Sequence, residues 1–172
     1  MKLLPTLTLL ALFGIRCAPL AMAQSTLEVY VVRHAEKLDP TNPDTPLSPA
    51  GNERAHDLAK RLSRVALGRI YATTKLRTQQ TVAVVAEQRR LEPVLLDPGA
   101  TEELVTRIRT ECAGMRVLVA GHSHTVPAIV LALSGKKIED MPDDRYDRLY
   151  HVIVPAEGPA TVKELRFGAP TP

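Results

Sequence analysis

Short apolar runs alternate with longer amphipathic segments from Leu27 onward, and this alternation limits the possible folds more than any other feature of the sequence. The run Leu27–Val32 is rich in β-branched residues and too short for a helix, so it is typical of a strand buried on both faces. Ser48 and Pro49 then form a helix start, and apolar residues at helical spacing predict a helix that continues to about Leu67.

Further strands and helices are expected in the same alternating order. Gly68 is predicted to end the first helix in the left-handed conformation. Strands are predicted at 69–72, 93–96 and 116–120, and helices at 75–90, from 101 onward and at 125–133. Strands that alternate with helices are joined by right-handed crossovers. The sequence therefore predicts one α/β domain with three α/β/α layers around a mainly parallel sheet.

The last part of the chain has a different pattern. Leu149–Val154 and Thr161–Phe167 flank a turn that contains Pro and Gly, which predicts a late strand pair. Residues 168–172 are expected to form a frayed tail. Cys112 lies on the apolar side of a predicted helix and is expected to be a small core residue. The charged residues of the first helix, Arg54 among them, are expected to face solvent.

Residues 1–23 have the pattern of a signal peptide. Lys2 precedes an apolar stretch from Leu3 to Ile15, and Ala21-Met22-Ala23 is a small-x-small cleavage site. The stretch is shorter than the about 20 apolar residues that a spanning helix needs, which favours cleavage over an uncleaved anchor. We therefore expect a signal peptide at 1–23, a single domain at 24–172 without a membrane span, and a periplasmic or secreted location.

Charge and aromatic content argue against a nucleic-acid partner. The formal net charge is +3, but residues 24–172 hold 20 basic and 19 acidic residues, so bulk charge gives no support for binding a polyanion. Aromatic residues make up 3% of the chain and there is no Trp. Few rings are thus present on which the bases of a single strand could stack.

Arginine and histidine residues follow three of the predicted strands. Arg33 and His34 follow the first strand, Arg77 lies in the first turn after the second, and Gly121-His122-Ser123-His124 follows the fourth. The carboxyl ends of parallel strands meet at one edge of a sheet, so we expect these side chains to lie close together. Two guanidinium groups can bind a phosphoryl group, and an imidazole can serve as nucleophile or proton donor.

The distribution of histidines supports this interpretation. The chain has five, and three of them (His34, His122 and His124) are expected at this edge. A single histidine after a strand is more often structural, so the coincidence of three carries the argument. The other two, His56 and His151, are expected to have structural roles.

Four sequence blocks resemble the motifs of the histidine phosphatase superfamily, which has the phosphoglycerate-mutase-like fold. They occur in the family's order: Val31-Val32-Arg33-His34-Ala35-Glu36-Lys37, Leu47-Ser48-Pro49-Ala50-Gly51, Thr73-Thr74-Lys75-Leu76-Arg77-Thr78-Gln79-Gln80-Thr81 and Gly121-His122-Ser123. The resemblance implies that His34 takes the phosphoryl group as nucleophile. It also implies that Arg33, Arg77 and His122 hold the phosphoryl oxygens, with His122 catalytic as well, and that no metal or other cofactor is required.

The family's general acid has no obvious counterpart in this sequence. Larger members carry a glutamate in a long insertion after the third strand, whereas this chain has only a short segment there. Asp97 and Glu102 are the candidates, and Glu102 could equally serve to stabilise the helix dipole. In this respect the chain resembles the short members that act on phosphohistidine.

These observations lead to one expected function and two alternatives. We expect an exported phosphatase that hydrolyses a phosphomonoester through a phosphohistidine intermediate. Its substrate would be a phosphorylated small molecule or a glycolipid, such as a sugar phosphate of the envelope. The first alternative is a non-catalytic module that binds phosphorylated ligands. The second is a metal-dependent hydrolase that uses His34, His122 and His124.

Overall fold

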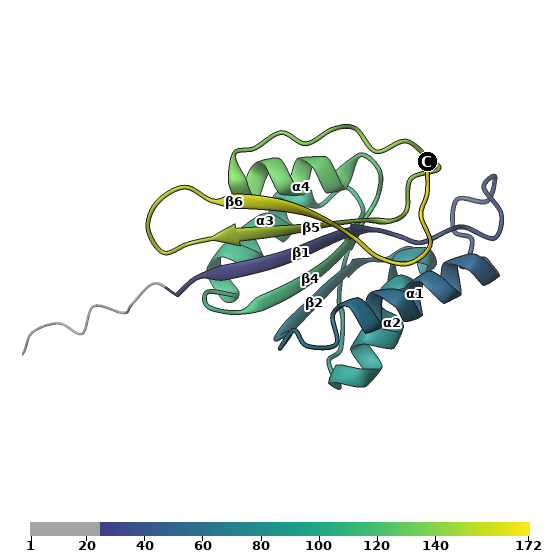
Figure 1. Ribbon diagram of the computed structural model, residues 1–172, viewed down its shortest axis with the longest axis horizontal. Helices are drawn as coiled ribbons and strands as arrows, with labels where there is room; N and C mark the ends of the chain where they lie inside the picture. Colours follow the sequence, from purple (N-terminus) through teal and green to yellow (C-terminus); the bar gives the residue numbers. More distant parts are fainter. Residues whose placement is uncertain (1–24) are drawn as a thin grey trace, which may run out of the picture.

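The computed structural model of the protein describes residues 25–172. Within this range six strands and four helices alternate along the chain (Figure 1). In chain order they are β1 (Leu27–Arg33), α1 (Pro49–Arg61), β2 (Arg69–Thr73), α2 (Leu76–Arg89), β3 (Val94–Leu96), α3 (Thr101–Glu111), β4 (Arg116–Gly121), α4 (Thr125–Ser134), β5 (Arg148–Val154) and β6 (Thr161–Arg166).

The strands form one sheet in the order β3-β2-β4-β1-β5-β6. β1, β2, β3 and β4 are parallel to one another, β5 pairs antiparallel with β1, and β6 pairs antiparallel with β5. This arrangement confirms the mainly parallel sheet and the late strand pair that the sequence predicts.

Helices cover both faces of the sheet, which gives the three α/β/α layers (Figure 1). The reason is visible in β1, whose successive side chains point to opposite faces. Val29 and Val31 pack in the core beneath α3 and α4, and Tyr30 and Val32 pack in the core beneath α1 and α2. A strand buried on both faces needs apolar residues on both sides, as the central residues Val29–Val32 of β1 provide. Cys112 belongs to the α3–α4 core and is fully buried, as expected.

Helix α1 is shorter than the sequence predicts. It ends at Arg61, with Leu62 as its C-terminal cap, instead of continuing to Leu67. The apolar residues Leu62 and Leu67 are buried all the same, in an irregular turn. Arg89 of α2 satisfies the carbonyl groups freed there, because its Nη2 donates to the oxygens of Leu62 and Ser63.

The expected left-handed conformation of Gly68 is also wrong. The φ angle of Gly68 is not in the left-handed region. Gly135, which ends α4, does adopt that conformation, with φ 71°. The N–H of Gly68 donates to the carbonyl of Arg116 in β4 over 2.8 Å. Gly68 thus pairs with β4 directly before β2 begins, and does not cap the helix. Met115 lies against the position that a Cβ of residue 68 would occupy.

The segment 168–172 is anchored and not frayed, contrary to the expectation from sequence. Arg54 Nη1 donates to the carbonyls of Phe167 and Ala169, and the Thr171 hydroxyl donates to the carboxylate of Asp147. Arg54 itself is 4% exposed, so its assignment to the solvent face of α1 is wrong as well. Both errors have one cause, since the buried guanidinium of Arg54 binds the tail.

The predicted signal peptide lies outside the described residues. Among residues 25–172, no helix is both long and apolar enough to cross a membrane.

Candidate active site

The parallel pairing of β1 with β4 brings two of the predicted histidines together. Arg33 is in register with Gly121, and the N–H of His34 donates to the Gly121 carbonyl over 2.9 Å. The rings of His34 and His122 are consequently 5.4 Å apart, centroid to centroid, in an edge-on arrangement. Both side chains are 4% exposed.

The hydrogen bond made by His34 determines which of its ring nitrogens is free. Its Nδ1 lies 2.8 Å from the carbonyl oxygen of Ala35, which can only accept, so Nδ1 carries the proton. Nε2 then keeps its lone pair. Burial, together with the positive charges of Arg33 and Arg77, lowers the pKa of His34 to about 3, against the opposing effect of the Ala35 hydrogen bond. His34 is therefore neutral at neutral pH, as a nucleophile must be.

Helix α2 holds the segment that carries His34. Thr81 Oγ1 accepts from the N–H of Ala35 over 2.9 Å and donates to the carbonyl of Arg77. Gln80 Oε1 accepts from the N–H of Leu47. The Arg-x-x-Gln-Thr pattern in α2 thus places one arginine at the site and two hydrogen-bonding side chains against the loops around it.

Arg33 is 2% exposed, but its charge is only weakly compensated. Its Nη1 donates to the carbonyls of Pro142 and Arg145, and its Nη2 to Asp143, a carboxylate that is 93% exposed. The guanidinium lies 4.3 Å from the ring centre of Tyr146, as in a cation–π contact. Its Nε is buried and has no hydrogen-bond partner among the described residues.

His122 lies in a chain of hydrogen bonds that runs from Arg77 to Thr78. Arg77 determines which group donates at each step. The Nη2 of Arg77, which can only donate, is 3.3 Å from His122 Nδ1, so Nδ1 accepts. Nε2–H then donates to Thr73 Oγ1 over 3.1 Å, and the Thr73 hydroxyl donates in turn to Thr78 Oγ1. Burial and the nearby Arg77 lower the pKa of His122 to about 4. This imidazole is also neutral in the free pocket at neutral pH.

Arg77 is held over the site by a loop on its other side. Its Nη1 donates to the carbonyl of Pro43, and the carboxylate of Asp44 accepts from the N–H of Leu76 at the start of α2. The Nε of Arg77 is a second buried donor without a partner in the described part of the chain. Two arginines with unused donors beside two neutral imidazoles form a site that attracts a small oxyanion.

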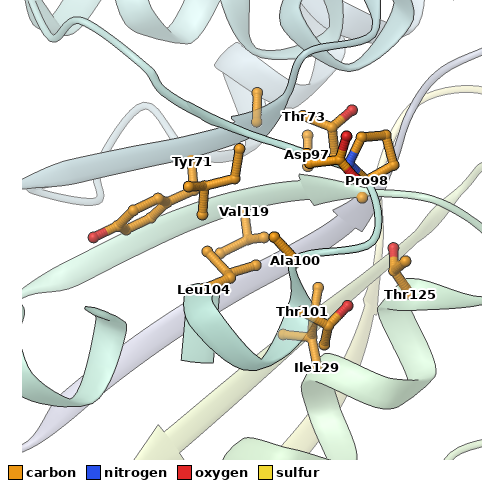
Figure 2. A pocket seen from close by; sticks show the side chains of 14 residues that line it. Tyr71, Thr73, Asp97, Pro98, Ala100, Thr101, Leu104, Val119, Thr125 and Ile129 are labelled. Atoms are coloured by element: carbon orange, nitrogen blue, oxygen red, sulfur yellow. The ribbon is translucent and has the colours of Figure 1, made fainter. Parts of the chain in front are cut away.

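The two candidate acids differ in position. Asp97 lines a cavity of ≈ 20 Å³ between β2, β4 and the starts of α3 and α4, together with Thr73, the partner of His122 (Figure 2). Its Oδ1 accepts from the N–H of Gly99. Glu102 lies in the first turn of α3 and does not line that cavity. Both residues are exposed.

The remaining histidines are divided between the site and the rest of the molecule. His124 is exposed, and its ring lies nearly parallel to that of His122 at 5.9 Å. His56 is exposed on α1, and His151 pairs with Glu28 at the opposite end of β1. In residues 25–172, no three His, Cys, Asp or Glu side chains are grouped so as to hold a metal ion.

Sequence reasoning missed Tyr146 and the two threonines Thr73 and Thr81. The Tyr146 ring lies 6.2 Å from that of His34 and covers Arg33. Nothing in the sequence pointed to it, because it follows a charged loop far along the chain. Thr73 and Thr81 fall within a quoted motif, but their hydrogen bonds depend on where β1 and β4 end.

Comparison with known proteins agrees with this geometry. Residues 29–102 match the family model of the histidine phosphatase superfamily, branch 1. No curated protein sequence matches the chain significantly. The solved structures that share the fold include three that this chain covers over at least 90% of their own length.

The first is the protein histidine phosphatase SixA complexed with tungstate, with 23% identity, a TM-score of 0.64, and coverage of 81% of this chain and 96% of that one. The second is a SixA from Nakamurella multipartitia assigned as a phosphohistidine phosphatase, with 19% identity, a TM-score of 0.65 and coverage of 86% and 99%. The third is a mycobacterial glucosyl-3-phosphoglycerate phosphatase, with 13% identity, a TM-score of 0.62 and coverage of 74% and 90%.

The matched residues include Arg33, His34 and Arg77, and the sheet order brings His122 to the same edge. The family match over residues 29–102 and the phosphoglycerate-mutase-like fold together support a phosphatase of the histidine phosphatase type.

Proposed function

We propose that the protein hydrolyses phosphomonoesters through a phosphohistidine formed on His34. The observation that carries the proposal is the free Nε2 lone pair of a buried, neutral His34 beside Arg33, Arg77 and His122. Nε2 attacks phosphorus, the bond from phosphorus to the ester oxygen breaks, and its electron pair leaves with the alcohol, which takes up a proton. Water then attacks the phosphohistidine, and the electron pair of the P–N bond returns to Nε2.

Arg33, Arg77 and His122 are assigned to the phosphoryl oxygens. The unused Nε donors of both arginines are available, and an oxyanion would also compete with the carbonyls of Pro43 and Pro142 that the guanidinium groups now bind. A dianion beside His122 would raise the pKa of this imidazole from its lowered value, so that it becomes a proton donor as the ligand binds. Positive charge of this kind is what a phosphoryl transition state needs most.

Turnover of p-nitrophenyl phosphate in the presence of a chelator tests this function. We expect hydrolysis that tungstate or vanadate inhibits, and radioactive phosphate on His34 after an alkaline quench. Label on Ser123 or Asp97 would contradict the assignment. Tight oxyanion binding without turnover would instead support the non-catalytic binding module, and loss of turnover with chelator would support the metal-dependent alternative.

A phosphoramidate such as phosphohistidine is a second candidate substrate. It is favoured by the exposure of Asp97 and Glu102, since a site without a buried acid suits a good leaving group. The likeness to phosphohistidine phosphatases points the same way. Comparison of kcat/KM for phosphohistidine peptides and for sugar phosphates separates the two substrate classes.

Export and an envelope substrate are further parts of the proposal. They are supported by the signal-like pattern of residues 1–23 and by the absence of long insertions around the site. Cleavage after Ala23 would leave β1, which begins at Leu27, intact. Recovery of the mature protein from a periplasmic or secreted fraction, with Gln24 as its first residue, would support export, and a cytoplasmic protein that begins at Met1 would contradict it. A screen that includes sugar phosphates and phosphorylated glycolipids tests the substrate.

A further inference from the structure

Arg54 joins the segment that carries His34 to the last residues of the chain. Its Nε and Nη2 bind both carboxylate oxygens of Glu36 at 2.7–2.9 Å, and its Nη1 donates to the carbonyls of Phe167 and Ala169. Glu36 lies two residues after His34. A buried guanidinium thus links the nucleophile's segment to the tail through a bidentate ion pair, the strongest geometry available to this side chain.

Thr171 binds the loop on the other side of the site. Its hydroxyl oxygen accepts from the N–H groups of Tyr146 and Asp147 at 3.1 and 3.3 Å, and its proton goes to Asp147 Oδ1 over 2.8 Å. Arg145 Nε also donates to the carbonyl of Pro172. In Figure 1 the end of the chain lies beside the loop that leads into β5.

That loop is the support of Arg33. The carbonyls of Pro142 and Arg145 accept from Arg33 Nη1, and the Tyr146 ring covers the guanidinium and lies near His34. Any movement of Tyr146 would therefore displace a phosphate-binding group as well as the cover of the nucleophile.

We propose that the segment Phe167–Pro172 is a strap that positions the phosphate pocket, with Arg54 and Thr171 as positioning residues on its two sides. The proposal rests on the proposed function. Neither side chain touches the phosphoryl group. Arg54 acts through Glu36 on the His34 segment, and Thr171 acts through Tyr146 and Asp147 on Arg33.

The sharper variant is Thr171→Val, which keeps the shape of the side chain and removes its hydrogen bonds. Asp147 would still pair with Arg148 and Arg166, so the fold should persist. We expect kcat/KM for p-nitrophenyl phosphate to fall about tenfold and inhibition by tungstate to weaken by a similar factor, the size of one lost hydrogen-bonding group. Thr171→Ser should recover most of both. The matched control is Thr161→Val, at an exposed threonine of β6.

Arg54→Lys tests the other side of the strap. An ammonium can pair with Glu36 but cannot bind the two carbonyls in the same fork. We expect lower kcat/KM than in Arg61→Lys, a control at an exposed arginine of the same helix. If the strap acts as one unit, adding Thr171→Val to Arg54→Lys should cost less than it does in the parent.

Parent kinetics and parent tungstate inhibition in a folded Thr171→Val variant would overturn the proposal, as would failure of Thr171→Ser to recover activity. The comparison is always with the parent protein, so failure of the proposed function would show separately. In that case the parent itself would neither turn over p-nitrophenyl phosphate nor bind tungstate.

Discussion

A histidine and an arginine lie near each end of strand β1, but the two ends differ in what balances the positive charge. At the amino end, Glu28 accepts from Arg116 at 2.9 Å and pairs with His151 at 2.8 Å, and the His151 ring stacks on Tyr30. At the carboxyl end, Arg33 and His34 lie beside Arg77 and His122, and the nearest carboxylate that binds Arg33 is the exposed Asp143.

The difference separates a structural cluster from a functional one. Glu28 satisfies its neighbours, and its own pKa is lowered by His151 and Arg116 despite partial burial. The pocket has an excess of positive charge and two unused guanidinium donors. A protein tolerates such an uncompensated arrangement where a ligand supplies the missing charge. The same residue types thus stabilise the fold at one end of β1 and, in the proposed function, bind substrate at the other.

The largest expected difference is between replacing His34 at the carboxyl end of β1 and replacing His151 near its amino end. His34→Ala or His34→Asn should lower kcat by at least about 1,000-fold, because the nucleophile is lost. His151→Asn should leave kcat within about twofold and destabilise the fold by about 1–2 kcal/mol, since it weakens the bond to the Glu28 carboxylate. Steady-state kinetics and urea unfolding measure both. A His151→Asn variant that is folded but inactive would break the distinction.

A smaller loss is expected when one of the unbalanced arginines is removed. Arg77→Ala should weaken vanadate or phosphate binding about 10- to 100-fold, the size expected for charge-assisted hydrogen bonds. Arg77→Lys should recover only part of this, because a point charge does not replace the planar fork. The matched control is Arg116→Ala, at the arginine of β4 that pairs with Glu28, and this variant should bind vanadate like the parent. Equal affinities in all variants would mean that Arg77 does not contact the oxyanion.

The pH dependence of kcat/KM tests the protonation of the two histidines in the pocket. Burial lowers the pKa of His34 to about 3 and that of His122 to about 4, so both are neutral in the free pocket above these values. The proton that His122 donates must then arrive with the phosphate, whose second pKa is about 6. We expect kcat/KM to be highest between about pH 4 and 6 and to fall about tenfold per pH unit well above this range. A flat profile up to pH 9 would contradict proton donation by His122.

Stability should also depend on pH through the buried histidines. Their folded pKa values lie below the unfolded value of about 6.5, so the unfolded chain binds more protons between the two values. Stability is thus full above pH 6.5 and decreases as the pH falls towards 4, by roughly 1.4 kcal/mol per pH unit for each histidine. His34→Asn should reduce this slope by about half. An unchanged slope in urea unfolding between pH 4.5 and 6.5 would show that His34 is not held neutral.

The smallest effect is expected at the two acidic residues near the pocket. Asp97 and Glu102 are exposed, and Asp97 Oδ1 accepts from the N–H of Gly99, so neither carboxyl group has the buried surroundings expected of a general acid. Asp97→Asn and Glu102→Gln should therefore hydrolyse a series of aryl and alkyl phosphates with the parent's dependence on leaving group. A selective loss with poor leaving groups in one variant would identify that residue as the general acid.

Residue order alone was enough to predict the layers of the fold and the edge of the sheet at which the candidate site residues lie. The periodicity of β1 and of the helical segments depends on local spacing, and parallel strands must bring Arg33, His34 and His122 to one edge. Those inferences needed no knowledge of distant contacts, which is why they could be made from residue order alone.

Which charges are compensated could be learned only from the folded molecule. Arg54 has the spacing of a solvent-facing helix residue, yet Glu36 and the carbonyls of Phe167 and Ala169 bury it, and Tyr146 reaches Arg33 from a loop before β5. The early end of α1 depends in the same way on Arg89, which comes from another helix. The burial of Arg54, the contact of Tyr146 with Arg33 and the early end of α1 have the same cause. The free energy of a buried charge, or of a carbonyl group released at a helix end, depends on partners that are distant in sequence.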